Sequence, residues 1–342
     1  MGELILYKEG KRINIGVIGA GVFGLEHIKT LQSIRGVNLF GICDQNEKQL
    51  FHVANQFKIN NTYTDAEDLL KEKELDGVII ATDEVSHEPL ARLATIYGKH
   101  VLLEKPVATN IETAEKLVRL EKESSTIIMP GHMLRFDPGY AKIKETLEMK
   151  ETSLKSLKVK RNVPYDRFTL HSRTHPVFMA LSHDVDQIIW NTSSLPKKIY
   201  AIQKQIDYNI KMPGILFGLI EFENGLICSL ETQWCLPNEY GQYLDVEFEA
   251  MMDTGQLKFR YPGETIHIMQ NGKLSQPDIQ FTPVVHGNMS GALRNELEHF
   301  LSLIEGSTSP VVTMEEAALG VKICEGLIRS ATEQREIQWE EL

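Results

Sequence analysis

Two short segments of this chain carry residue types suited to hydride-transfer chemistry. Residues 13–24 read INIGVIGAGVFG, an apolar run that leads into three spaced glycines. Residues 102–108 read LLEKPVA and place Lys105 at the end of a second apolar run. An ammonium group beside a bound nucleotide can stabilise an alkoxide or polarise a ketone. Together the two segments predict a dinucleotide site with a lysine at its reactive edge.

The glycines occur in the order that a dinucleotide-binding turn requires. Gly19 permits the tight turn, Gly21 lets a pyrophosphate approach the backbone, and Gly24 lets the next helix pack close to the strand. That helix, expected from about Phe23 to Ile34, directs its first N–H groups toward the phosphates, so Val22 and Phe23 are expected cofactor contacts. The alternative is an ordinary strand–turn–helix in which the glycines only shape the turn.

A carboxylate follows at the place where such a site binds ribose. The apolar run 37–43 ends at Asp44, about 20 residues beyond the glycines. A carboxylate accepts from the ribose hydroxyls and repels a 2′-phosphate, and the next residues, Gln45 and Asn46, include no arginine. The sequence therefore predicts NAD as the cofactor, with NADP disfavoured.

Length, charge and cysteine spacing bound the class of protein. A chain of 342 residues suggests two domains, predicted as a nucleotide-binding domain over 1–130 and a substrate-binding and oligomerisation domain over 131–342, with a C-terminal helix that packs back on the first. A net charge of −11 argues against nucleic-acid or anionic-membrane partners. The four cysteines lack C-x-x-C spacing, which favours free thiols in the cytoplasm over a metal site.

The pattern of elements changes near residue 130. Strands and helices alternate before it, which predicts an N-terminal doubly wound parallel sheet of α/β class. After it, strand-like runs follow one another, with Asn224-Gly225 and Asn271-Gly272 as hairpin turns. This second part predicts an α+β domain with a large open, mostly antiparallel sheet. Its expected strands are 154–162, 198–206, 215–223, 226–234 and 243–251.

Several motifs occur in the order seen in one enzyme family. The segments INIGVIGAGVFG, ATDEVSHEPLA at 81–91, LLEKPVA, GHMLRFDP at 131–138 and SHDVDQIIW at 182–190 resemble the Gfo/Idh/MocA oxidoreductases, which include glucose–fructose oxidoreductase and inositol 2-dehydrogenase. The resemblance implies a Rossmann domain, a nicotinamide cofactor and a sugar or cyclic polyol substrate. It also implies a homodimer or homotetramer formed through the open sheet.

The resemblance also implies roles for individual residues. Lys105 matches the active-site lysine, and His183 matches the acid/base histidine of an H-D-x-D motif, a role that suits a pKa near neutrality. Many members carry an aspartate four residues before that histidine, whereas this chain has Met179. A simple Asp–His dyad is therefore in question. Further cofactor contacts are expected at Thr82, His87 and Glu104, besides Lys105 itself.

A dense group of cations precedes the predicted catalytic histidine. Two interpretations are open: an anion site for phosphate, carboxylate or a nucleotide diphosphate, or a solvated segment that forms salt bridges. Tyr165 and Phe168 could pack on a sugar ring. The cations are Lys158, Lys160, Arg161, Arg167, His171, Arg173 and His175. The expected substrate contacts are Arg135, Arg161, Tyr165, Arg173, His175 and Asp184.

Three function classes are compatible with these residues. The first is an NAD-dependent dehydrogenase that oxidises a secondary hydroxyl of inositol, a sugar or a phosphorylated or nucleotide-linked sugar. The second is a glycoside hydrolase that oxidises its sugar transiently and releases no NADH. The third is a non-catalytic NAD- or sugar-binding regulator. The presence of both Lys105 and His183 favours an enzyme, and the absence of an acid at position 179 keeps the regulator open.

Overall fold

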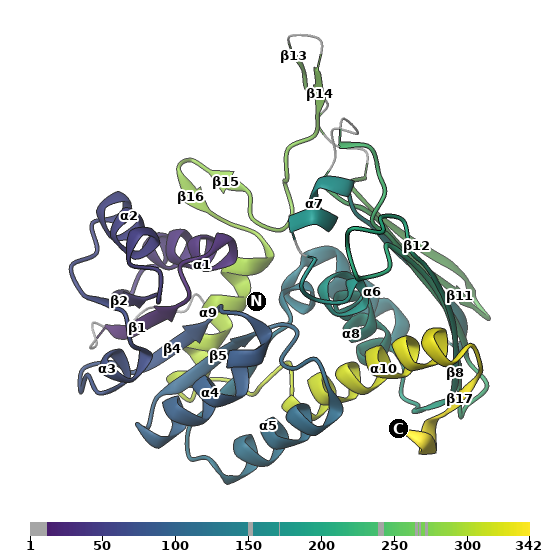
Figure 1. The fold of residues 1–342 in the computed structure, drawn as a ribbon, viewed down its shortest axis with the longest axis horizontal. Helices are drawn as coiled ribbons and strands as arrows, with labels where there is room; N and C mark the ends of the chain where they lie inside the picture. The colour runs from purple at the N-terminus through teal and green to yellow at the C-terminus, as the bar shows by residue number, and fades with distance from the viewer. Residues whose placement is uncertain are drawn as a thin grey trace. The chain divides into compact units, whose positions relative to one another are not determined.

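The computed structural model describes residues 12–149, 153–170, 172–238, 243–263, 266, 268–270 and 273–342. The chain divides into two compact units (Figure 1). Unit 1 consists of Met1–Val107, Lys116–Met133 and Phe281–Met314, and unit 2 of Ala108–Glu115, Leu134–Gln280 and Glu315–Leu342. Residues 108–115 belong to unit 2, which a single boundary at residue 130 does not predict. Residues 281–314 return to unit 1, as expected of a late helix that packs back on the first domain.

Unit 1 is built on a six-stranded parallel sheet with the order β3-β2-β1-β4-β5-β6. This is the strand order of a dinucleotide-binding fold. Its central strands are buried on both faces, which explains their nearly continuous apolar sequences. The strands are β1 (Ile13–Ile18), β2 (Val37–Cys43), β3 (Thr62–Tyr63), β4 (Gly77–Ile80), β5 (His100–Glu104) and β6 (Ile128–Gly131).

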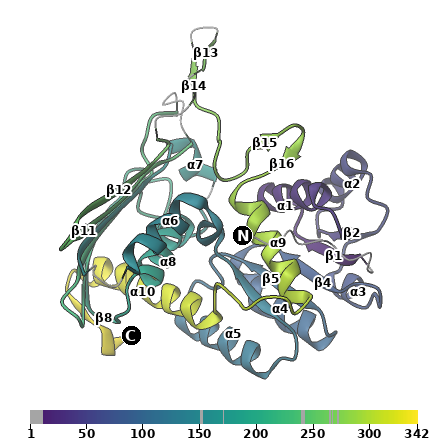
Figure 2. The same cartoon turned by 180° about the vertical axis from the view of Figure 1, so that it is seen from behind.

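Helices cover both faces of this sheet (Figures 1 and 2). One comes from late in the chain, because Arg294 of α9 donates to the carbonyls of Ser33 at the end of α1 and of Met289. In the described residues, no helix is both long and apolar enough to cross a bilayer. The helices are α1 (Val22–Ser33), α2 (Glu47–Phe57), α3 (Ala66–Leu70), η1 (Glu84–Ser86), α4 (His87–Ile96), α5 (Ile111–Glu123), which extends into unit 2, and α9 (Ala292–Ile304).

Unit 2 contains a seven-stranded sheet with the order β12-β11-β7-β10-β9-β8-β17. The β7–β10 pair is parallel and the others are antiparallel. Gly225, at φ +82°, makes the predicted turn between β9 and β10. Two strands of this sheet, β12 and β17, were not expected from the sequence. The strands are β7 (Leu154–Asn162), β8 (Pro196–Lys204), β9 (Ile215–Phe222), β10 (Ile227–Gln233), β11 (Asp245–Met252), β12 (Gly255–Tyr261) and β17 (Ile337–Gln338).

In the part of the chain that the structure describes, the helices of unit 2 pack against one face of its sheet (Figure 1). On that face, Ser330 accepts a hydrogen bond from the Ala201 N–H of β8, and the side chain of Leu327 lies against Gly218 of β9. The helices are η2 (Met133–Phe136), α6 (Pro138–Leu147), α7 (Tyr165–Leu170), the π-helix η3 (Val177–Leu181), α8 (Ser182–Asn191), α10 (Met314–Glu333) and η5 (Trp339–Glu341).

Two small hairpins complete the fold. The pair β13 (Ile268–Gln270) and β14 (Lys273–Ser275) is antiparallel, although the Asn271-Gly272 turn predicted between them lies outside the described residues. The second pair is β15 (Val284–Val285) with β16 (Asn288–Met289).

Candidate active site

Two glycines of the turn after β1 sit where no side chain fits. Gly19 has φ +99°, and a Cβ built on it would lie 2.4 Å from the Ala81 carbonyl oxygen. A Cβ on Gly24 would lie 1.9 Å from the carbonyl oxygen of Gly19. These contacts bring the end of β1, the end of β4 and the first turn of α1 together.

Gly21 is different, because a Cβ there would meet no atom within 4 Å. It is the N-cap of α1, and no side chain caps this helix. The first N–H groups of a helix have no partner within it, and the helix dipole makes this end positive. The uncapped helix end and the room at Gly21 fit the pyrophosphate of a dinucleotide.

Asp44 lies beside this turn and is held there by the backbone. One carboxylate oxygen accepts the Ala20 N–H at 2.7 Å, and the other accepts the Asn46 N–H at 2.8 Å. Gln49 of α2 also donates to the Ala20 carbonyl at 2.9 Å. Each carboxylate oxygen has a second lone pair for a ribose hydroxyl. No sequence motif points to Gln49, because its contact depends on how α2 packs.

The strand β5 delivers Lys105 next to a buried carboxylate. Glu104 is 5% exposed; its Oε1 lies 2.7 Å from His27 Nε2, and its Oε2 accepts the Lys105 N–H at 3.1 Å. The Lys105–Pro106 peptide is cis. Both oxygens of Glu104 are therefore engaged inside unit 1. The carboxylate therefore supports the lysine segment, and its contact with the cofactor stays a prediction.

His87 also supports the lysine segment from within. Its Nδ1 lies 3.0 Å from the Pro106 carbonyl oxygen, and its Nε2 lies 3.2 Å from that of Thr82. The ring is 1% exposed, and burial lowers its pKa although both carbonyls favour the charged form. A ring buried to this degree has little surface for NAD. Thr82 is half-buried, and its contact with the cofactor stays a prediction.

In unit 2, His183 occupies the first turn of α8 and is half-buried. The next residue anchors this turn, because Asp184 accepts from Arg161 of β7 at 2.6 and 3.1 Å. Both side chains are almost fully buried. Burial alone would lower the pKa of Arg161, but the Asp184 carboxylate raises it, so the guanidinium stays charged. The structure therefore assigns this pair to the interior, where it fixes the His183 helix, and not to the substrate as expected.

The second aspartate of the H-D-x-D motif makes a similar anchor. Arg135 of η2 donates to both oxygens of Asp186, at 2.7–3.1 Å, and to Glu316 of α10 at 2.9 Å. The Arg135 side chain is fully buried, so it too is an internal group and not the expected substrate contact. The motif thus directs both acids inward, while its histidine stays half-buried.

The segment before His183 is not a regular α-helix. Residues 177–181 form a π-helix, whose wider turn breaks the four-residue spacing that would place Met179 below His183. Met179 packs instead against an apolar cluster that includes Trp234. Phe168 belongs to the same cluster and is 1% exposed, so it cannot stack on a sugar ring as expected. Tyr165 is partly exposed, and its hydroxyl donates to Asp207 at 2.5 Å.

Strand geometry divides the cationic segment between two faces. Successive side chains of a strand point to opposite faces, so Lys158 and Lys160 face away from Arg161. They pair there with acids of β11, Glu247 at 3.7 Å and Asp245 at 3.0 Å. The interpretation as salt bridges therefore describes this part of the segment better than a shared anion pocket.

The rest of the segment provides few available charges. Arg167 lies 4.4 Å above the ring of Tyr243, Arg173 is exposed, and His171 lies outside the described residues. His175 Nδ1 accepts the Val177 N–H and its Nε2 lies 3.3 Å from Gln203 Oε1, which defines a neutral ring. Burial lowers its pKa to about 4, so it is no cation at neutral pH.

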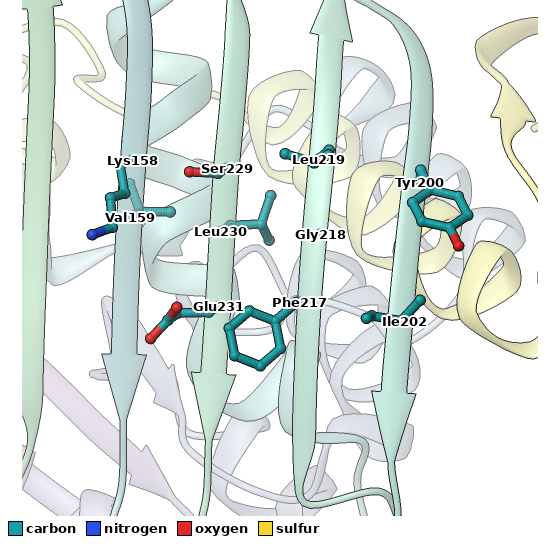
Figure 3. Close-up of a pocket in the computed structure, with 10 residues that line it drawn as sticks. All are labelled: Lys158, Val159, Tyr200, Ile202, Phe217, Gly218, Leu219, Ser229, Leu230 and Glu231. Atoms are coloured by element: carbon teal, nitrogen blue, oxygen red, sulfur yellow. The ribbon is translucent and has the colours of Figure 1, made fainter.

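A shallow groove lies on the face of the unit 2 sheet that carries no helix (Figure 3). We call this the open face. Most of the groove is apolar, with Lys158 and Glu231 as its charged members. Since Arg161 and Asp184 lie on the other face, this groove is separate from the His183 helix. Its exposed apolar residues are Tyr200, Ile202, Phe217 and Leu219.

Comparison with family models decides the identity of the fold. Residues 13–132 match the oxidoreductase family with an NAD-binding Rossmann fold, and residues 160–258 match the Gfo/Idh/MocA C-terminal domain. The chain belongs to the Gfo/Idh/MocA family. It is an oxidoreductase of this family with NAD as its cofactor, as the turn at Gly21 and the carboxylate of Asp44 indicated.

Similar proteins agree with the family. Inositol 2-dehydrogenase 2 of Saccharopolyspora erythraea is 27% identical over 303 residues, which cover 85% of this chain and 84% of that protein. A 4-carboxy-2-hydroxymuconate-6-semialdehyde dehydrogenase of a Sphingobium species is 24% identical over 86% and 91%. The structure of scyllo-inositol dehydrogenase from Lactobacillus casei with NAD(H) and scyllo-inositol matches with a TM-score of 0.83, 20% identity and coverage of 96% and 100%.

Proposed function

We propose that this family member is an NAD-dependent dehydrogenase that oxidises a secondary hydroxyl of a neutral cyclic polyol or sugar. The observation that carries this proposal is the lysine segment at the end of β5, tied through Glu104 to helix α1 of the nucleotide site. Relatives of this chain are named inositol 2-dehydrogenases. A regulator that only binds NAD would not need a lysine held in this way.

Each reacting group has a task that suits its chemistry. NAD supplies the hydride acceptor. His183, on the anchored first turn of α8, takes the proton of the substrate hydroxyl, a role for which a neutral imidazole is suited. The Lys105 ammonium stabilises the negative charge that develops on that oxygen. Met179 stands where many family members carry an aspartate, so the proposal assigns the proton transfer to His183 without a carboxylate at that position.

A neutral substrate fits the charges better than an anionic one. The guanidinium groups of Arg135 and Arg161 are already bound to carboxylates. His175 is neutral, and Lys158 and Lys160 lie on the open face. These pairings remove most of the cations on which a phosphate or nucleotide-diphosphate site depends. We therefore place inositols and neutral sugars before phosphorylated or nucleotide-linked sugars.

Screening for NADH formation tests this function. The panel holds myo-inositol, scyllo-inositol, neutral sugars, sugar phosphates and nucleotide sugars, each with NAD. We expect one equivalent of NADH for each neutral polyol oxidised. Sugar turnover without NADH would instead identify the hydrolase that oxidises its substrate transiently. Binding of NAD with no turnover of any compound would leave the non-catalytic regulator as the remaining function class.

We also propose that the open face binds a second copy of the chain. Its apolar side chains are solvent-exposed, with Ile202 at 55% and Leu219 at 51%, and patches of this kind mark interfaces. Light scattering should give at least a dimer, and Ile202→Glu with Leu219→Lys should shift it to monomer. A monomeric wild-type chain would contradict the assembly.

The free cysteines support a cytoplasmic protein, which fractionation of the source cells tests.

A further inference from the structure

The lysine segment rests on a histidine that lies far from it in sequence. His27 belongs to the second turn of α1 and is completely buried. Its Nε2 lies 2.7 Å from Glu104 Oε1. An ionised carboxylate only accepts hydrogen bonds, so the proton of this bond lies on Nε2. Among the described residues, no hydrogen-bond partner reaches the other nitrogen, Nδ1.

The Glu104 carboxylate links His27 to the backbone of Lys105. Its second oxygen, Oε2, accepts the Lys105 N–H at 3.1 Å. The space around it is limited, because a Cβ on Gly131 of the neighbouring strand β6 would lie 3.2 Å from Glu104 Oε1. The ring of Phe23 packs edge-on against His27 with centroids 5.2 Å apart. Phe23 thus restricts the imidazole ring of His27, and the neighbouring strand β6 restricts the carboxylate of Glu104.

We propose that His27 is a positioning residue for the lysine: it fixes Glu104, and Glu104 fixes the backbone at Lys105. Helix α1 begins at the turn that binds the pyrophosphate, so the same helix aligns the cofactor and, through His27, the group that stabilises the oxyanion. Small errors in such alignment are costly, since a misplacement of about 1 Å can lower a rate about 100-fold. The inference rests on the proposed function for its effect on rate, but not for its effect on structure.

Amide hydrogen exchange at Lys105 tests the positioning without any substrate. His27→Phe keeps a ring against Phe23 and removes the donor. We expect the Lys105 amide to exchange at least about 10-fold faster in this variant, while β1 and β4 stay protected. His27→Gln offers a donor near the position of Nε2 and should restore protection to within about threefold.

Two further variants separate local positioning from general destabilisation. Thr30→Ala removes another fully buried polar group from the same helix, one that bonds only to the Glu26 carbonyl, and it should leave Lys105 exchange unchanged. Glu104→Ala leaves no buried carboxylate unpaired, so it serves if His27→Phe does not fold, and it should expose the same amide. Unchanged exchange at Lys105 in His27→Phe or Glu104→Ala, or an equal rise in Thr30→Ala, would overturn the proposal.

Kinetics add the functional half of the test. With the polyol that the NADH screen identifies, His27→Phe should lower kcat about 10-fold or more and His27→Gln should recover most of it. The Kd of NAD, measured by calorimetry, should change less than about threefold, since His27→Phe keeps a ring against Phe23 and leaves the turn at Gly21 unaltered. Faster exchange with unchanged kcat would refute the positioning role. If no compound reacts, the proposed function fails and the exchange measurement still decides whether His27 holds the lysine segment.

Discussion

Arg161 and Asp184 form a buried ion pair, with Arg161 Nε 2.6 Å from Asp184 Oδ2, directly beside the predicted catalytic His183. Because the pair joins β7 to the first turn of α8, it determines where that histidine stands. Arg161 belongs to the cationic segment that could have formed an anion site, but its guanidinium instead holds the first turn of α8 in place. His183 on that turn is the residue that we assign to proton transfer.

Breaking this pair should be costly. Arg161→Met leaves the Asp184 carboxylate buried and unpaired, and we expect a loss of about 3–5 kcal/mol in the free energy of unfolding, measured in urea. Combining it with Asp184→Leu removes the stranded charge and should recover most of the loss. Lys160→Ala, which removes a partly exposed pair on the adjacent position of β7, should cost less than about 1 kcal/mol. Equal losses for Arg161→Met and Lys160→Ala would contradict the structural role.

Alanine substitutions at two glycines of the nucleotide turn should have different effects, one on stability and the other on NAD binding. Gly24→Ala places a Cβ 1.9 Å from the Gly19 carbonyl oxygen, so it should lower thermal stability. Gly21→Ala meets no protein atom and should fold normally, but its methyl group occupies the space of the pyrophosphate. We expect a Kd for NAD at least about 10-fold higher in Gly21→Ala, measured by calorimetry. Normal NAD affinity in this variant would place the cofactor elsewhere.

His175 should make the fold sensitive to acid. Burial lowers its pKa from 6.5 to about 4, so between these values the unfolded chain binds a proton that the folded chain does not. Stability therefore falls as the pH drops from 6.5 toward 4. His175→Asn keeps an acceptor for the Val177 N–H and removes the titrating ring. Urea unfolding at several pH values should show a shallower pH dependence in this variant, and identical slopes would refute the effect.

Local patterns in the sequence predict most of the fold but few of its polar contacts. The apolar runs locate β1, β7 and β10, and Asp137 caps α6 as its position before Pro138 predicts. The spacing Thr109-x-x-Glu112 predicts a capping box with Thr109 as the N-cap, but Asn110 accepts the Thr113 N–H at the start of α5 instead. Such errors are local and small.

Contacts between distant residues explain what the sequence could not predict. His27 and Glu104 are 77 residues apart, and Arg135 and Asp186 are 51 apart. No spacing rule links them, since the first pair depends on how a helix packs on a sheet and the second on how two helices pack together. The π-helix before His183 is a further case, because its apolar sequence also suits an α-helix. The site residues whose roles changed are those with such distant partners.

Substitution of Lys105 tests the proposed mechanism most directly. In Lys105→Met, with NAD and the polyol identified by the NADH screen, kcat should fall about 100-fold or more, because the ammonium acts on charge that develops in the transition state. The Kd of NAD should stay within about threefold of the wild type. A kcat equal to that of the wild type would remove Lys105 from the chemistry and contradict the proposed mechanism.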